Sequence, residues 1–196
     1  MPAVYGCGKG SVTEPALSFD PTTGIGDIAQ TSRASDRGCP SGPAYETANG
    51  SSNVLFIGAN FTTTAGHHRV VSHWIIDWRM RVSEIANGSP SPPAACVVFS
   101  LSTYLMGLHG RTFGQGSNAW DPGALCTNLG NLTVSAVSHV ALVTNATLLA
   151  GHTYFLVANM SVFTGVYISA MGTSATASFN AGTSGHFARL VSVQVY

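Results

Sequence analysis

Charged side chains are scarce in this chain of 196 residues. Asp, Glu, Lys and Arg together make up 8% of it, against about a quarter of an ordinary soluble domain. Eight basic residues balance eight acidic ones, and Lys9 is the single lysine. Binding of nucleic acid requires clustered Lys and Arg. These totals therefore predict a protein without a nucleic acid partner.

Signals for membrane insertion and for a removable leader are also missing. No run of eighteen apolar residues exists, so the sequence predicts no membrane-spanning helix. Residues 1–5 lack the basic and apolar regions of a signal peptide. Either a signal was removed, or the protein leaves a cytosol inside an assembly, as virion proteins do. The hydrophobic fraction of 45% is ordinary, which predicts one folded domain with a single core.

Catalytic and metal-binding motifs are absent as well. The glycine-rich segment 6–11 lacks the spacing of a phosphate loop, and residues 182–186 lack that of a nucleophile elbow. His73 and Asp77 share one face of an expected strand, but about 13 Å separates them, too far for one ion without a further element. The sequence predicts no enzyme, no cofactor and no metal centre.

Short apolar segments separated by turn residues predict an all-β protein. The clearest runs from Val70 to Val82, where apolar and polar side chains alternate with period two, as in an amphipathic strand. Many short strands with Gly, Asn, Ser and Thr turns indicate an antiparallel β-sandwich or jelly-roll-like single domain. The expected strands are 53–58, 70–82, 96–101, 104–108, 132–143, 153–160, 162–171, 175–179 and 187–195.

Two segments lack this pattern. Residues 1–50 are rich in Gly, Pro, Ser, Thr and Asp. They predict an extended, irregular arm packed on or exchanged with neighbouring molecules, and residues 51–196 then form the sandwich. Residues 109–131 read as a long glycine-rich loop, of the kind that often carries a binding function.

Four cysteines form an even set without a C-x-x-C pair: Cys7, Cys39, Cys96 and Cys126. Zinc sites usually bring two ligands close in sequence, so disulfides are favoured. Three pairings are possible. We favour Cys7–Cys39 and Cys96–Cys126, because each closes a loop of about thirty residues, worth roughly 3.5–4 kcal/mol in the chain-entropy model.

Six of ten asparagines head an N-x-[Ser/Thr] triplet, where about two are expected by chance from 41 Ser and Thr residues. This excess predicts N-glycosylation of an exported protein. The segment 148–156 also resembles the L-x-A-G-x-x-Y turn and strand of many exported sandwich domains. The six candidate sites are Asn49, Asn60, Asn87, Asn131, Asn145 and Asn159.

Three functions remain open. The favoured hypothesis is a non-enzymatic structural subunit of a surface filament, coat or virion exterior, which binds copies of itself through sheet edges and the arm. The alternative is a carbohydrate-binding or adhesion module, with Tyr104, Phe113 and Trp120 in or near the 109–131 loop as an aromatic platform for sugar. A hydrolase on a jelly-roll scaffold ranks last. The expected location is extracellular, on a cell surface or on a virion surface.

Overall fold

The structure is a computed structural model. It describes residues 3–5, 9–13, 17–20, 23, 25–35, 46–85, 94–115, 119–127, 130–168, 174–181 and 186–196. Within these ranges, only the backbone is described for residues 3–19, 27, 35, 46–59 and 114–115.

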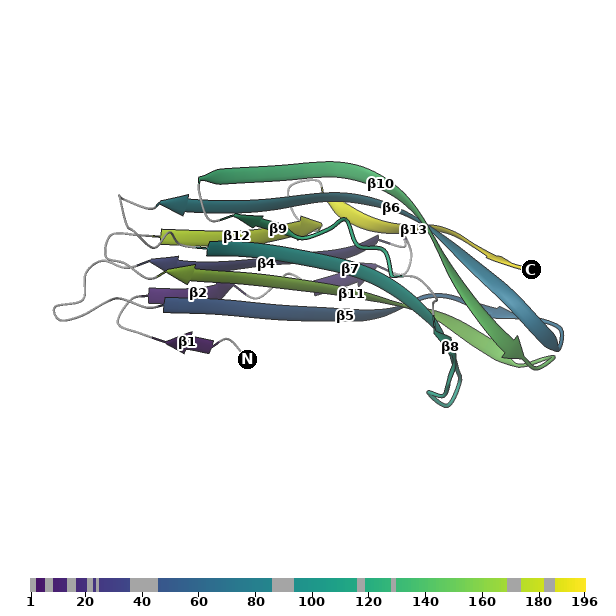
Figure 1. Cartoon of the computed structure of the whole chain (residues 1–196). Helices are drawn as coiled ribbons and strands as arrows, with labels where there is room; N and C mark the ends of the chain where they lie inside the picture. The colour runs from purple at the N-terminus through teal and green to yellow at the C-terminus, as the bar shows by residue number, and fades with distance from the viewer. Residues whose placement is uncertain are drawn as a thin grey trace.

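The described residues form two antiparallel sheets (Figure 1), which confirms the predicted all-β sandwich. One, the β11 sheet, has the order β1 (Ala3–Tyr5), β5 (Glu46–Thr62), β11 (Thr153–Ile168) and β7 (Ala94–Gly107). Two short strands, β8 (Thr112–Gln115) and β9 (Leu125–Thr127), pair with the remaining edge of β7.

The second, the β6 sheet, begins at β10 (Asn131–Leu148), which pairs with β6 (Gly66–Ile85). Next, β12 (Ser174–Ala181) and β13 (Phe187–Val195) follow each other between β6 and β4 (Ile25–Ser35). The far edge of β4 pairs with β2 (Lys9–Thr13) and β3 (Leu17–Asp20).

The core lies between the sheets and follows from strand alternation. On β6, the even-numbered side chains Trp74 to Val82 are buried, and the odd-numbered ones face outward, as predicted. The rings of Phe99 on β7 and Phe179 on β12 stack at 4.4 Å and so join the two sheets. Burial of one such side chain is worth about 1.5–3 kcal/mol.

The described part of the N-terminal fifty residues differs from the expected irregular arm. β4 lies inside the β6 sheet, and Ile28 and Ala34 are buried. Its other inward residues are polar, which hides the strand pattern in the sequence. They bond across the sandwich, where Gln30 Nε2 donates to Thr164 Oγ1 at 2.8 Å and Ser32 Oγ lies 2.7 Å from the same atom; Gln30 Oε1 has no hydrogen-bond partner among the described residues. β5 begins at Glu46, so the expected boundary at residue 50 falls within a strand.

Several expected strands are longer than predicted. The segments 96–101 and 104–108 form the single strand β7, because Thr103 is buried and its hydroxyl lies 3.2 Å from that of Thr144. Likewise, 153–160 and 162–171 join in β11, which ends at Ile168. The 109–131 loop contains β8, β9 and a backbone bridge from Trp120 to Leu101. Only 187–195 has the predicted bounds.

Candidate interaction surfaces

The first candidate surface is the outer edge of β10. This strand of 18 residues pairs with β6 along its whole length. Along residues 131–140, no described residue pairs with the opposite edge. In Figure 1, β10 borders the upper layer of the sandwich. Backbone groups on such an edge are available to another strand.

The first half of β10 also exposes apolar side chains. Leu132 and Val134 point to the same side of the strand as the buried Val140 and Leu142. Leu132 is nevertheless 44% exposed and Val134 42% exposed, so the β11 sheet does not cover them. On the outward side Val137 is 57% exposed. The whole strand contains no Asp, Glu, Lys, Arg or Pro. Natural edge strands usually carry such residues, which hinder pairing with another chain.

The second candidate surface is a pocket at one end of the sandwich, with a volume of about 430 Å³. Two hairpins meet there: the turn from β7 to β8, and the turn from β10 to β11. Gly110 in the first turn has φ 75°, a left-handed conformation that glycine adopts without strain. The lining residues are Gly107, Leu108, His109, Arg111, Phe113, Leu149, Gly151, His152, Thr153 and Tyr154.

Aromatic rings form the floor of this end pocket. Phe113 and Tyr154 meet edge to face, with 5.2 Å between ring centroids. The guanidinium carbon of Arg111 lies 5.6 Å from the Phe113 ring centroid, in cation–π range. The Tyr154 hydroxyl accepts a hydrogen bond from Leu149 N–H at 2.8 Å, which fixes the ring. A Cβ at Gly107 would lie 2.6 Å from Phe113, so only glycine allows this packing.

The three predicted platform residues do not converge. Tyr104 lies on the outer side of β7, whereas Phe113 packs on the inner side of the same sheet against Tyr154. Trp120 packs on the rim of the core, edge to face with Phe99 and Trp78. Of the predicted set, only Phe113 belongs to a pocket.

Sequence reasoning missed the other polar residues of the end pocket, His109, Arg111 and His152. Each stands in a turn whose type is readable from the sequence. However, the two turns are about forty residues apart, and only the pairing of β11 with β7, with Tyr154 opposite Gly107, brings them together. The glycine and histidine beside each turn, G-L-H-G-R and A-G-H-T, were the available signals.

The six candidate glycosylation sites differ in accessibility. The side chains of Asn60, Asn131 and Asn145 are exposed. Asn159 is half-buried, and its Oδ1 is buried without a hydrogen-bond partner among the described residues. The side chain of Asn49 and the whole of Asn87 lie outside the described residues. Glycosylation stays a prediction, best supported at the three exposed positions.

Cys96 and Cys126 form a disulfide between paired positions of β7 and β9. This is the pairing favoured by loop length, and it suits an oxidising compartment. The bond ties the glycine-rich segment back onto the β11 sheet. The expected partners Cys7 and Cys39 lie outside the described residues, so their pairing stays a prediction.

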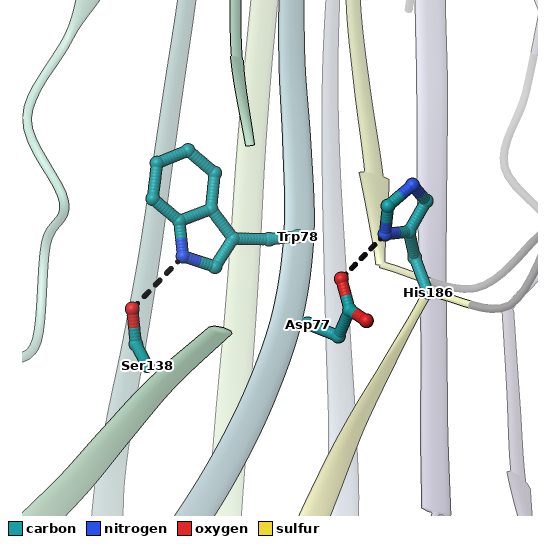
Figure 2. Close-up of polar contacts among 4 residues, drawn as sticks. All are labelled: Asp77, Trp78, Ser138 and His186. Carbon is teal, nitrogen blue, oxygen red and sulfur yellow. Dashed lines mark hydrogen bonds and ion pairs between the residues drawn. The ribbon is translucent and has the colours of Figure 1, made fainter. Parts of the chain in front are cut away.

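Of the candidate metal residues on β6, Asp77 pairs with a histidine that directly precedes β13. His186 Nδ1 lies 2.6 Å from Asp77 Oδ1 on the outer side of the sheet, while Trp78 on the inner side donates from Nε1 to Ser138 Oγ at 3.0 Å (Figure 2). His67 Nδ1 is 2.9 Å from Thr147 Oγ1. The described part of the chain holds no group of three or more His, Cys, Asp or Glu placed to bind a metal ion.

Glu84 is a carboxyl group turned into the sandwich. It is 6% exposed, and neither carboxylate oxygen makes a hydrogen bond to a described residue. Burial raises the pKa of Glu84 from 4.5 to about 7, and the nearby backbone of Ala95 offsets this only in part. The charge of Glu84 therefore changes near neutral pH.

No protein-family model matches the chain, and no curated protein matches it. Among solved structures, it is similar to one described as a study of promiscuous specificity in carbohydrate-binding modules of the β-sandwich superfamily. That match has 11% identity and a TM-score of 0.20. It covers 90% of this chain but only 54% of the other chain.

Two further solved structures are similar at the same low level. One is a family 11 carbohydrate-binding module from Clostridium thermocellum, with 6% identity and TM-score 0.18. The match covers 87% of this chain and 89% of the module. The other is a structure of infectious bursal disease virus, Gx strain, with 9% identity and TM-score 0.16. The match covers 96% of this chain and 61% of the viral chain. At these scores the likenesses carry no argument about function. Among the described residues there is no helix long and apolar enough to cross a membrane.

Proposed function

We propose that this protein is a non-enzymatic structural subunit of an extracellular or virion-surface assembly, and that its copies associate along the β10 edge. The observation that carries the proposal is a long edge strand with exposed apolar side chains and no charged residue or proline. Antiparallel addition of a strand to this edge would satisfy its open backbone groups and bury Val134 and Val137.

The expected occupant is a second copy of β10. Two identical strands with charges of one sign would repel each other, but β10 has no such charge. Antiparallel pairing of β10 with itself has two-fold symmetry, the commonest arrangement in homo-oligomers. It would continue the β6 sheet from one copy into the next.

The glycosylation sites are compatible with this contact. Asn131 and Asn145 share the outward side of β10 with Val137, because an even number of residues separates them along the strand. Glycans there would stand on the outer surface of the β6 sheet, beside the open edge. They would supply the solubility that the few charged residues do not.

Sedimentation velocity over a concentration series tests the proposal. The wild-type protein should form dimers or larger species, and Val137→Lys should be monomeric, because lysine on an edge opposes pairing. Val191→Lys is the matched control: Val191 is 55% exposed in the same sheet, but its strand β13 pairs with β6 on the side away from β10. A wild-type protein that stays monomeric up to its solubility limit would overturn the proposal, as would equal dissociation by both variants.

A second candidate function is binding of a neutral oligosaccharide in the end pocket. The aromatic floor of Phe113 and Tyr154, with His109, Arg111 and His152 at the rim, favours it, since sugar sites combine aromatic and hydrogen-bonding groups. A glycan array followed by calorimetry would identify a ligand. Binding should weaken in His152→Ala and persist in His67→Ala. An array that stays blank at high protein concentration would remove this candidate.

A further inference from the structure

The outer surface of the β6 sheet carries a shallow groove lined by arginines. Two adjoining hollows, with volumes of about 260 and 210 Å³, share Thr31, Arg81 and Ser178. They cross β4, β12 and β6, where Ser178 pairs in register with both Arg81 and Thr31. Because the three residues lie in one row, the hollows form one continuous surface.

Three guanidinium groups line this arginine groove: Arg33 on β4, and Arg79 and Arg81 on β6. All three are exposed. Arg79 and Arg81 are two residues apart, or about 7 Å along the strand, and Arg33 stands two strands away, or about 10 Å across the sheet. The spacing suits several separate anionic groups better than a single ion.

The groove has little negative charge to neutralise these arginines. No Asp or Glu is among its described lining residues, and no described carboxylate forms an ion pair with Arg33, Arg79 or Arg81. On the outward side of β6, the one described carboxylate is that of Asp77, which is paired with His186. The positive potential of the groove is therefore available to a ligand.

Hydroxyl and amide side chains surround the arginines. Thr31, Ser83, Thr176, Ser178 and Asn180 line the groove. Thr133 and Ser135 of β10, in register with Arg81 and Arg79, extend the polar surface to the edge of the sheet. Short polar side chains of this kind bind sugar hydroxyls. The groove exposes no aromatic ring for base stacking, since its single aromatic residue, Phe179, is buried.

We propose that the arginine groove binds an anionic polysaccharide. Its sulfate or carboxylate groups would accept charge-assisted hydrogen bonds from Arg33, Arg79 and Arg81, and its hydroxyls would bond to the Thr and Ser side chains between them. The site is separate from the end pocket and from the β10 edge, and it does not depend on self-association.

Binding of dextran sulfate, with unmodified dextran as the uncharged probe, tests this site directly. The wild-type protein should bind dextran sulfate, more weakly as salt rises, and should not bind dextran. Arg81→Gln should weaken binding about tenfold, the size of one charge-assisted contact, and the triple variant of Arg33, Arg79 and Arg81 to Gln should abolish it. No binding of either dextran sulfate or alginate would overturn the proposal.

Two controls separate the groove from general charge attraction. Arg69→Gln removes an arginine of β6 that is outside the groove, and it should leave binding unchanged. The double variant Arg81→Gln/Ser161→Arg restores the net charge but moves the guanidinium to the outward side of β11, so it should bind as weakly as Arg81→Gln. Equal losses in Arg69→Gln and Arg81→Gln, or full rescue by the double variant, would contradict a defined site.

Single-stranded DNA is the third probe. Oligothymidylate with a similar number of charges should bind more weakly than dextran sulfate, because the groove offers hydroxyl groups and no stacking ring. If the oligonucleotide binds as tightly and responds to the same variants, the site is one for polyanions in general and the polysaccharide proposal fails.

Discussion

The two outer surfaces of the sandwich differ in charge although the two inner surfaces are alike. Along β7 and β11 the described outward side chains include no charged residue, and Phe163 and Tyr167 are 40% and 38% exposed. The outer surface of the β6 sheet carries most of the chain's cations. Its described charged residues on β4, β6 and β13 are Arg33, Arg69, Asp77, Arg79, Arg81 and Arg189.

This difference shows that the distribution of charge is more informative here than its total. Eight basic and eight acidic residues give a net charge of zero, which by itself argues against any anionic partner. Strand alternation then sends the arginines of β6 and β4 to one side of one sheet, where Asp77 is the one described acidic residue of these two strands. A locally positive surface results on a neutral protein.

The largest expected effect tests which surface of the β11 sheet is interior. Phe99→Ala should lower the free energy of unfolding by about 3–5 kcal/mol, because Phe99 is fully buried against Phe179 and Trp120. Phe163→Ala, on the neutral outer surface, should cost about 1 kcal/mol or less. Denaturant unfolding followed by tryptophan fluorescence gives both values. Equal losses of unfolding free energy would mean that the outer surface of the β11 sheet, where Phe163 lies, is also buried in the isolated protein.

Glu84 is the exception to the outward placement of charge in the β6 sheet, and it makes stability depend on pH. Its folded pKa of about 7 exceeds the unfolded value of 4.5. The protein should therefore be most stable below pH 4.5 with respect to this group and lose that stability as pH rises through 7. After allowance for screening by solvent, the loss should be about 1–2 kcal/mol. Glu84→Gln should remove this slope; identical pH profiles would contradict the assignment.

A smaller effect is expected from the ion pair on the outer surface of the β6 sheet. Asp77→Asn should cost about 0.5–1 kcal/mol, because the pair with His186 is partly exposed to solvent. A double-mutant cycle with His186→Ala isolates the interaction. A coupling energy well above this range would show that the pair holds β13 against β6 and that charged residues on this surface stabilise the fold.

The smallest expected effect concerns the arginines of the groove. Arg79→Gln and Arg81→Gln should each change the free energy of unfolding by less than about 0.5 kcal/mol, since both side chains are exposed and form no described ion pair. Thermal unfolding checks this. A larger loss would mean that these arginines stabilise the fold. The difference in charge between the outer surfaces of the β6 and β11 sheets would then be explained by stability and not by ligand binding.

Much of the fold was predictable from local pattern, and two of the exceptions share a cause. Val70–Val82 was predictable because all of its inward residues except Ser72 are apolar. β4 was not, because Gln30 and Ser32 occupy inward positions and rely on Thr164 of the opposite sheet. β7 was divided at Ser102 and Thr103 for the same reason. A buried polar residue resembles a turn residue until its partner is known.

The candidate sites divide in a similar way. The open edge of β10 could be anticipated in part, because the absence of charge and proline from 131–148 is a property of the sequence. The end pocket could not, since Phe113 and Tyr154 lie on β8 and β11, which meet only because both strands pair with β7. The predicted platform failed for the converse reason: Tyr104 and Phe113 are near in sequence but point to opposite sides of their sheet.

The sequence by itself determined the all-β class, the alternation of the long strands and the scarcity of charge. These depend on the period of side chains along one strand, which is local. The tertiary structure decided which strands are edges, which surfaces stay uncovered, and that Arg33 joins Arg79 and Arg81 across β12. Those outcomes depend on pairing between segments far apart in the chain, and no local pattern encodes that pairing.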